Sequence, residues 1–132
     1  IAGVDILHSH ELNEIVNNIT AKYSDCNSST WALWEHLTHK ISFQDVDGWE
    51  TIPKLIGNSD CILFVLTEKF AMHLPNGYVL GTILSDTFGF VFYVTNTTFD
   101  YLLCFNDHDF VIGCGIAEKW IIDYYGLNSV SS

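Results

Sequence analysis

The chain has 132 residues, of which 48% are hydrophobic and 14% aromatic, a composition that excludes intrinsic disorder and fits a single domain spanning residues 1–132. Sixteen acidic residues against five lysines, with no arginine, give a formal net charge of −11. A chain without guanidinium groups lacks the best binders of phosphate, so we expect no nucleic acid as a partner and favour a basic protein.

The beginning of the chain and its longest apolar run bear on location. Residues 1–7 carry no basic segment of the kind that opens a signal peptide. The longest unbroken apolar run, Cys61–Leu66, is too short to cross a bilayer. We therefore expect a cytoplasmic protein with no membrane partner.

The first third of the chain predicts two helices. Over Ser9–Ser24, apolar residues recur at the helical spacing, and over Thr30–Ile41 an aromatic-rich stripe follows a capping threonine. The two stripes consist of Leu12, Ile15, Val16, Ile19 and Tyr23 in the first helix and of Trp31, Trp34, Leu37 and Ile41 in the second.

The middle of the chain predicts a loop, a short helix and a buried strand. Residues 43–48 form the loop. The helix that follows has Trp49, Ile52, Leu55 and Ile56 on its inner side, and Gly57 stops it at its C-terminal end. Cys61–Leu66 is typical of a strand covered on both faces, and we expect it at the centre of a sheet. Residues 67–75 give no clear pattern.

The last third predicts a helix, three antiparallel strands and a closing helix. The first helix starts after Asn76-Gly77 and ends near Gly89. The strands are Phe90–Thr95, Phe99–Phe105 and a run from Phe110 to Gly115. The closing helix has Ile116, Trp120, Ile121 and Tyr124 on one side, and Gly126 lies just past its end. We expect an α+β fold, with a small antiparallel sheet of about four strands packed with N-terminal, middle and C-terminal helices.

The four cysteines show no metal-binding or redox spacing. Cys26, Cys61, Cys104 and Cys114 include no C-x-x-C pair, which favours reduced structural thiols, although a Cys104–Cys114 bridge stays open if their strands are neighbours. Gly113-Cys114-Gly115 is not a phosphate loop, because Glu118 stands where the motif needs glycine. We expect no cofactor.

The densest polar cluster is Asn106-Asp107-His108-Asp109, between two apolar strands. A hairpin turn, a partner-contact patch and an acid/base or metal site are all consistent with these residue types. In an extended chain Asp107 and Asp109 would share a side while His108 pointed away.

A second acidic group surrounds a tryptophan. Asp45, Asp47 and Glu50 flank Trp49, and an exposed aromatic ringed by carboxylates would suit docking against a lysine- or arginine-rich surface. Alternatively, the loop only adds solubility and Trp49 turns into the core. The sequence does not show whether the two acidic groups share a face.

Three segments in the last third of the chain form a loose motif: Gly89–Thr95, Asp100–Asp109 and Ala117–Trp120. In these segments the chain resembles small acidic immunity proteins of bacterial contact-dependent growth inhibition and related polymorphic toxin systems. The resemblance implies a stoichiometric inhibitor, not an enzyme, that binds a basic toxin domain, often a nuclease, inside the producing cell.

The hypothesis is therefore an immunity protein that contacts its toxin through Asp45, Asp47, Trp49, Glu50, Asp107, His108 and Asp109. One alternative is a small metal-dependent hydrolase that uses Asp107, His108 and Asp109 with a distant histidine, His36 or His39. The other is a homodimeric structural module whose surplus aromatic residues form a subunit interface.

Overall fold

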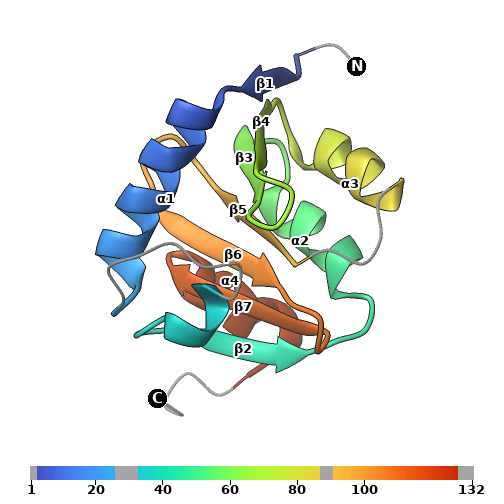
Figure 1. Ribbon diagram of the computed structural model, residues 1–132. Helices are drawn as coiled ribbons and strands as arrows, with labels where there is room; N and C mark the ends of the chain where they lie inside the picture. Colours follow the sequence, from blue (N-terminus) through green and yellow to red (C-terminus); the bar gives the residue numbers. More distant parts are fainter. Residues whose placement is uncertain (1–2, 26–32, 87–90, 128–132) are drawn as a thin grey trace.

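One antiparallel sheet with helices on both faces forms the framework of the protein (Figure 1). The computed structural model describes residues 3–25, 33–86 and 91–127. In chain order the elements are β1 (Asp5–Leu7), α1 (Ser9–Tyr23), the 3-10 turn η1 (Leu33–His36), β2 (Ile41–Gln44), α2 (Gly48–Ile56), β3 (Cys61–Val65), β4 (Phe70–Leu74), α3 (Gly77–Ser85), β5 (Phe92–Thr95), β6 (Tyr101–Phe105), β7 (Phe110–Gly115) and α4 (Ala117–Tyr125).

The sheet separates two apolar cores. Its strands follow the order β1-β4-β3-β5-β6-β7-β2. Helices α2, α3 and α4 cover one face through residues such as Ile52, Leu80 and Ile121, whereas α1 and the segment around η1 cover the other through residues such as Ile19 and Leu33. The protein is therefore a three-layer arrangement, with α1 and α4 on opposite sides of the sheet (Figure 1).

Strand β3 has an unbroken apolar sequence because both of its faces are buried. Leu63 faces the core under α2 and α3, while its neighbours Ile62 and Phe64 face the core under α1. A strand covered on both faces has no solvent side on which to place polar residues. The prediction of double coverage is confirmed, although β5, not β3, is the middle strand of the sheet.

The predicted α+β class and the β5–β6 hairpin are confirmed. Phe92 pairs with Phe105 and Val94 with Leu103 across the hairpin. The predicted strand number was wrong, because the described residues form seven strands instead of about four. The additional strands are β1 and β2, at the two edges of the sheet, and β4, in a segment without a clear sequence pattern.

The predicted helices are confirmed in part. Helices α1, α2 and α3 start close to their predicted positions, and Asn76 caps α3 by accepting a hydrogen bond from the Val79 backbone N–H (2.9 Å). The helix predicted over Thr30–Ile41 was wrong. Within the described residues 33–41 of that range, only the turn η1 is helical, and Ile41 begins the edge strand β2. Thr30, Trp31 and Gly89 lie outside the described residues.

The closing helix α4 buries only part of the apolar side that the sequence predicts. Ala117 and Ile121 are fully buried, and Trp120 packs beside them against the core. Ile116 and Tyr124 are 51% and 47% exposed, so the core contact of the predicted apolar side comes from Trp120 and Ile121. Among the helices of the described segments, none combines the length and the hydropathy needed to span a bilayer.

Candidate functional site

The pairing of β2 with β7 brings the two acidic segments together. Gln44 lies opposite Phe110, and one residue further the Asp45 backbone N–H donates to the carbonyl of Asp109 (2.8 Å). The Gln44 side chain donates to the carbonyl of His108 (3.1 Å). The end of β2, the start of α2 and the β6–β7 turn therefore meet at one place.

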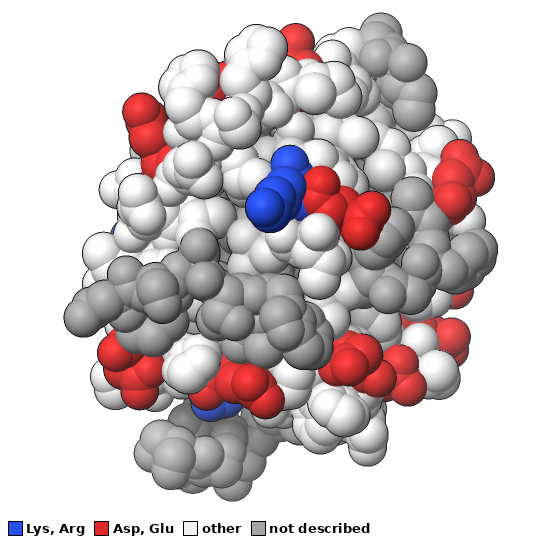
Figure 2. Space-filling view, in the orientation of Figure 1, with Lys and Arg blue, Asp and Glu red and all other residues white. Residues whose placement is uncertain are grey.

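We call this place the acidic corner. It consists of Asp45, Val46, Asp47, Glu50, Asp107, His108 and Asp109. Five of the sixteen acidic residues lie in it, and its two segments, residues 44–50 and 106–110, contain no lysine. Figure 2 shows acidic side chains over this part of the molecule, at the lower right, and further acidic side chains elsewhere on the same face.

Asp45 organises the first segment of the corner. Its carboxylate accepts hydrogen bonds from the Asp47 backbone N–H (3.0 Å), the Thr51 hydroxyl (3.4 Å) and the Tyr125 hydroxyl (2.7 Å). The Tyr125 ring stacks on Phe43, with 4.2 Å between the ring centroids. Burial is the main cause that raises the pKa of Tyr125 to about 12, so this hydroxyl stays a donor at neutral pH. Asp45 thus joins α4 to the loop before α2.

The exposed apolar residue of the corner is Val46, not Trp49. Trp49 is half-buried and packs against the core, which agrees with the alternative in which it turns inward. Val46 lies between Asp45 and Asp47 in the sequence, and it is 67% exposed. Sequence reasoning missed Val46; the available signal was an aliphatic residue placed between two aspartates in a predicted loop.

The second segment of the corner is a tight turn held by a buried asparagine. Asn106 is 3% exposed, and its side-chain oxygen accepts hydrogen bonds from the backbone N–H groups of His108 and Phe110, both at 3.0 Å. Asp109 has φ 63°, the left-handed conformation that Asp and Asn tolerate best after glycine. The hairpin-turn interpretation of these residues is therefore confirmed.

This turn exposes Asp107 and His108 to solvent. Their side chains are 54% and 64% exposed, and they approach each other to 3.7 Å. The prediction that His108 points away from Asp107 was wrong because it assumed an extended chain. The His108 ring also packs edge-on against Trp34, with 5.7 Å between the ring centroids.

The histidines proposed as distant metal ligands lie in other environments. His36 lies 3.6 Å from Asp25, at the end of η1, and His39 is exposed in the segment before β2. Within residues 3–25, 33–86 and 91–127, no group of three or more histidine, cysteine, aspartate or glutamate side chains is arranged to hold a metal ion. The hydrolase alternative thus lacks an assembled ligand set in the described part of the chain.

Cys104 and Cys114 lie on neighbouring strands as buried free thiols. The β6–β7 register places Cys104 opposite Ile112 and Cys114 opposite Leu102, so the two cysteines do not face each other directly. Burial raises the pKa of the Cys114 thiol to about 12, which is the opposite of the activation that a nucleophile requires. Cys26 lies outside the described residues.

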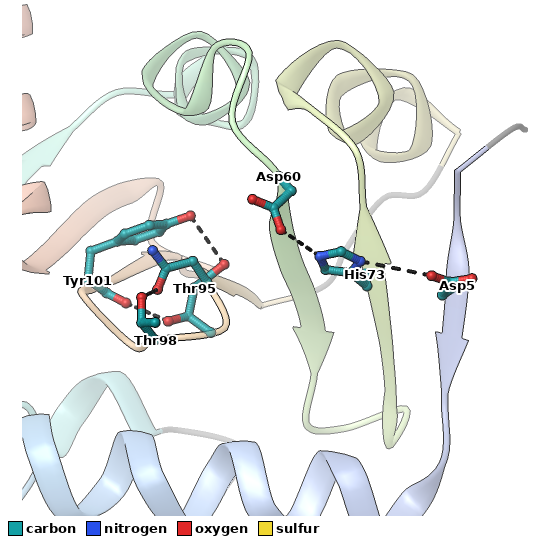
Figure 3. Close-up of polar contacts among 7 residues, drawn as sticks. Asp5, Asp60, His73, Thr95, Thr98 and Tyr101 are labelled. Carbon is teal, nitrogen blue, oxygen red and sulfur yellow. Dashed lines mark hydrogen bonds and ion pairs between the residues drawn. The ribbon is translucent and has the colours of Figure 1, made fainter.

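A second polar cluster lies on β1, on β4 and just before β3, at the edge of the sheet opposite β2. No local sequence pattern indicates it. His73 on β4 lies between Asp60, at 2.7 Å, and Asp5 of β1, at 3.9 Å (Figure 3). The three residues are far apart in the sequence, and only the β1–β4–β3 pairing places them together.

Comparisons with protein-family models, with curated proteins and with solved structures found no match to this chain.

Proposed function

We propose that this chain is a non-enzymatic immunity protein that neutralises a cognate basic toxin domain, a nuclease in our hypothesis, by stoichiometric contact through the acidic corner. The observation that carries the proposal is the contact between the two acidic segments, the first of which exposes the side chain of Val46.

The composition of the corner supports a protein partner. Tight interfaces combine an apolar contact that excludes water with charged groups at the rim, and the corner offers Val46 beside the exposed carboxylates of Asp47, Glu50 and Asp107. A nuclease active site is basic because it receives phosphates. The corner carboxylates would therefore attract such a surface and speed association.

The rigidity of the corner also supports this role. The hydrogen bonds of Asp45 and Asn106 fix both segments before any partner arrives. A preformed surface loses less conformational entropy on binding, which favours high affinity. In this proposal Asp45 positions the loop, and Asp47, Glu50, Asp107 and His108 make the contacts.

The test is inhibition of the C-terminal toxin domain encoded immediately upstream. The purified chain should abolish toxin activity at an equimolar ratio and form a one-to-one complex in sedimentation. The double variant Asp47→Lys/Asp107→Lys should lower the association rate at low salt by about tenfold or more.

The control variant, Glu68→Lys/Asp86→Lys, changes the net charge equally at exposed positions outside the corner. It should inhibit almost as well as the wild-type chain. Undiminished toxin activity in the equimolar mixture would refute the proposed function, and equal losses in both double variants would refute the corner as the contact surface.

A further inference from the structure

A groove with a volume of about 370 Å³ lies between α1 and the sheet. Apolar side chains from four parts of the chain line it: Leu7 of β1, Ile15 of α1, Ile62 of β3 and Phe99 of the β5–β6 turn. Glu11 and Glu14 of α1 also line it and, three residues apart, they share one side of the helix. We call these six residues the α1 groove. Its volume is within the range of small-ligand sites.

The α1 groove is bounded by fixed elements. The Phe99 carbonyl accepts hydrogen bonds from the Tyr23 hydroxyl (2.6 Å) and the Lys22 ammonium (2.7 Å), which tie the β5–β6 turn to α1. His73, which also lines the groove, lies between Asp60 and Asp5 (Figure 3). The groove is therefore formed before a ligand arrives.

The charge of the α1 groove selects a cation. Glu14 is exposed, and Glu11 uses its Oε1 atom to accept from the His8 backbone N–H (2.9 Å). No lysine is among the residues that line the groove, and Lys22, the lysine on the same helix, is bonded to the Phe99 carbonyl. Anions are repelled here, and a purely apolar ligand would gain no electrostatic attraction from the two carboxylates.

We propose that the α1 groove binds a lysine or arginine side chain presented by a segment of a basic partner protein. The aliphatic stem of such a side chain would lie on Leu7, Ile15 and Ile62, and its charged end would meet Glu11 and Glu14. Long cationic side chains place their methylene groups on apolar surface in this way while the charge stays hydrated. A second copy of this chain, with its net charge of −11, is a poorer occupant.

The α1 groove is independent of the acidic corner. The groove includes Phe99, which precedes β6, whereas the corner includes Asp107, which follows β6. The two sites thus lie at opposite ends of the same strand, and failure of one proposal leaves the other standing.

The test is an amide NMR titration of the full chain with single-residue probes. The probes are three acetylated and amidated tripeptides with lysine, arginine or the neutral isostere norleucine between two alanines. The lysine or the arginine peptide should shift the amide signals of Glu14, Ile62 and Phe99, and the norleucine peptide should not. Glu14→Gln should weaken this binding about threefold or more, because one exposed charge interaction is lost, and Glu68→Gln should leave it unchanged.

Three outcomes would overturn the proposal. They are equal shifts with the norleucine peptide, an unchanged affinity in Glu14→Gln, and shifts at residues 107–109 as large as those in the groove. The last outcome would mean that the cationic peptides are attracted to the acidic surface in general and do not bind specifically in the groove. Glu14 is exposed on α1, so its substitution tests binding without threatening the fold.

Discussion

At the scale of single residues, Asp45 and Tyr125 connect the stability of the fold to the shape of the acidic corner. The Tyr125 hydroxyl donates to the Asp45 carboxylate at 2.7 Å, and the same carboxylate holds the Asp47 backbone. A hydrogen bond to a charged acceptor stabilises a folded protein more than one between neutral groups. The loop that presents Val46 and Asp47 therefore depends on a residue at the end of α4.

Replacing Tyr125 by phenylalanine should lower the free energy of unfolding by about 1–2 kcal/mol. The ring still stacks on Phe43, so the loss reports the hydroxyl alone. Urea denaturation measures it. Tyr124→Phe is the matched control, since it removes a hydroxyl from a side chain that is 47% exposed. Equal effects of the two substitutions would contradict the role of the Tyr125–Asp45 bond.

At the scale of elements, the close contact between β7 and α4 depends on a glycine. A Cβ atom at Gly113 would lie 2.6 Å from Ile121 Cδ1 and 3.0 Å from the Ala117 carbonyl oxygen. Both neighbours belong to α4 and are fully buried, so neither can move away freely.

Gly113→Ala should therefore destabilise the protein by about 1–3 kcal/mol, the usual cost of overpacking a core. Gly81→Ala is the contrasting variant. Its Cβ would lie 3.5 Å from Pro53, an ordinary contact, and alanine is the better helix former, so its stability should be unchanged or up to about 1 kcal/mol higher. Denaturation midpoints of the two variants give the comparison, and a Gly113→Ala protein as stable as the wild type would disprove the packing argument.

The elements that were predicted from the sequence are long or fully buried, whereas the elements that were missed are short or only partly buried. Helix α1 and the buried strands β3 and β6 carry long or unbroken apolar patterns, which are read without tertiary information. Strand β2 alternates over only four residues. Because Ile41 also lies at the helical spacing from Leu37, the strand was absorbed into a predicted helix.

Because strand β2 was not predicted, the two acidic segments were not predicted to lie together. Each acidic segment is recognisable locally, but their contact arises from the β2–β7 pairing between distant parts of the chain. No local pattern encodes that pairing. The α1 groove and the Asp5–His73–Asp60 cluster depend in the same way on β1 and β4, a three-residue edge strand and a strand without clear alternation.

At the scale of the whole molecule, the buried phenols and thiols make stability depend on alkaline pH. Burial raises the pKa of Tyr23 to about 12 from 10.0 and that of Cys61 to about 12 from 9.0. It raises the pKa values of Tyr93 and Tyr101 further. In the unfolded chain these groups lose their protons near their ordinary pKa values, whereas the folded chain retains them.

These groups should therefore leave the free energy of unfolding unchanged below about pH 9. The free energy of unfolding should fall as the pH rises toward 12, because the unfolded state then binds fewer protons than the folded state. Urea denaturation between about pH 8 and about pH 11 measures the slope. The variant Tyr101→Phe removes one ionising group and should show a shallower slope than the wild type. A free energy of unfolding that stays constant over this interval would contradict the burial of these groups.

Because the sheet lies between two separate cores, its central and edge strands should differ in amide hydrogen exchange. Backbone amides of β3, β5 and β6 lie under a helical layer on each side. Solvent deuterium can reach them only when a whole layer detaches, an opening nearly as costly as global unfolding. Among the strands that the structure describes, the edge strands β1 and β2 pair on one side only, so their amides can open separately. The acidic corner follows directly from one such edge and the α1 groove touches the other, which places both candidate contact surfaces beside the parts of the sheet that exchange first.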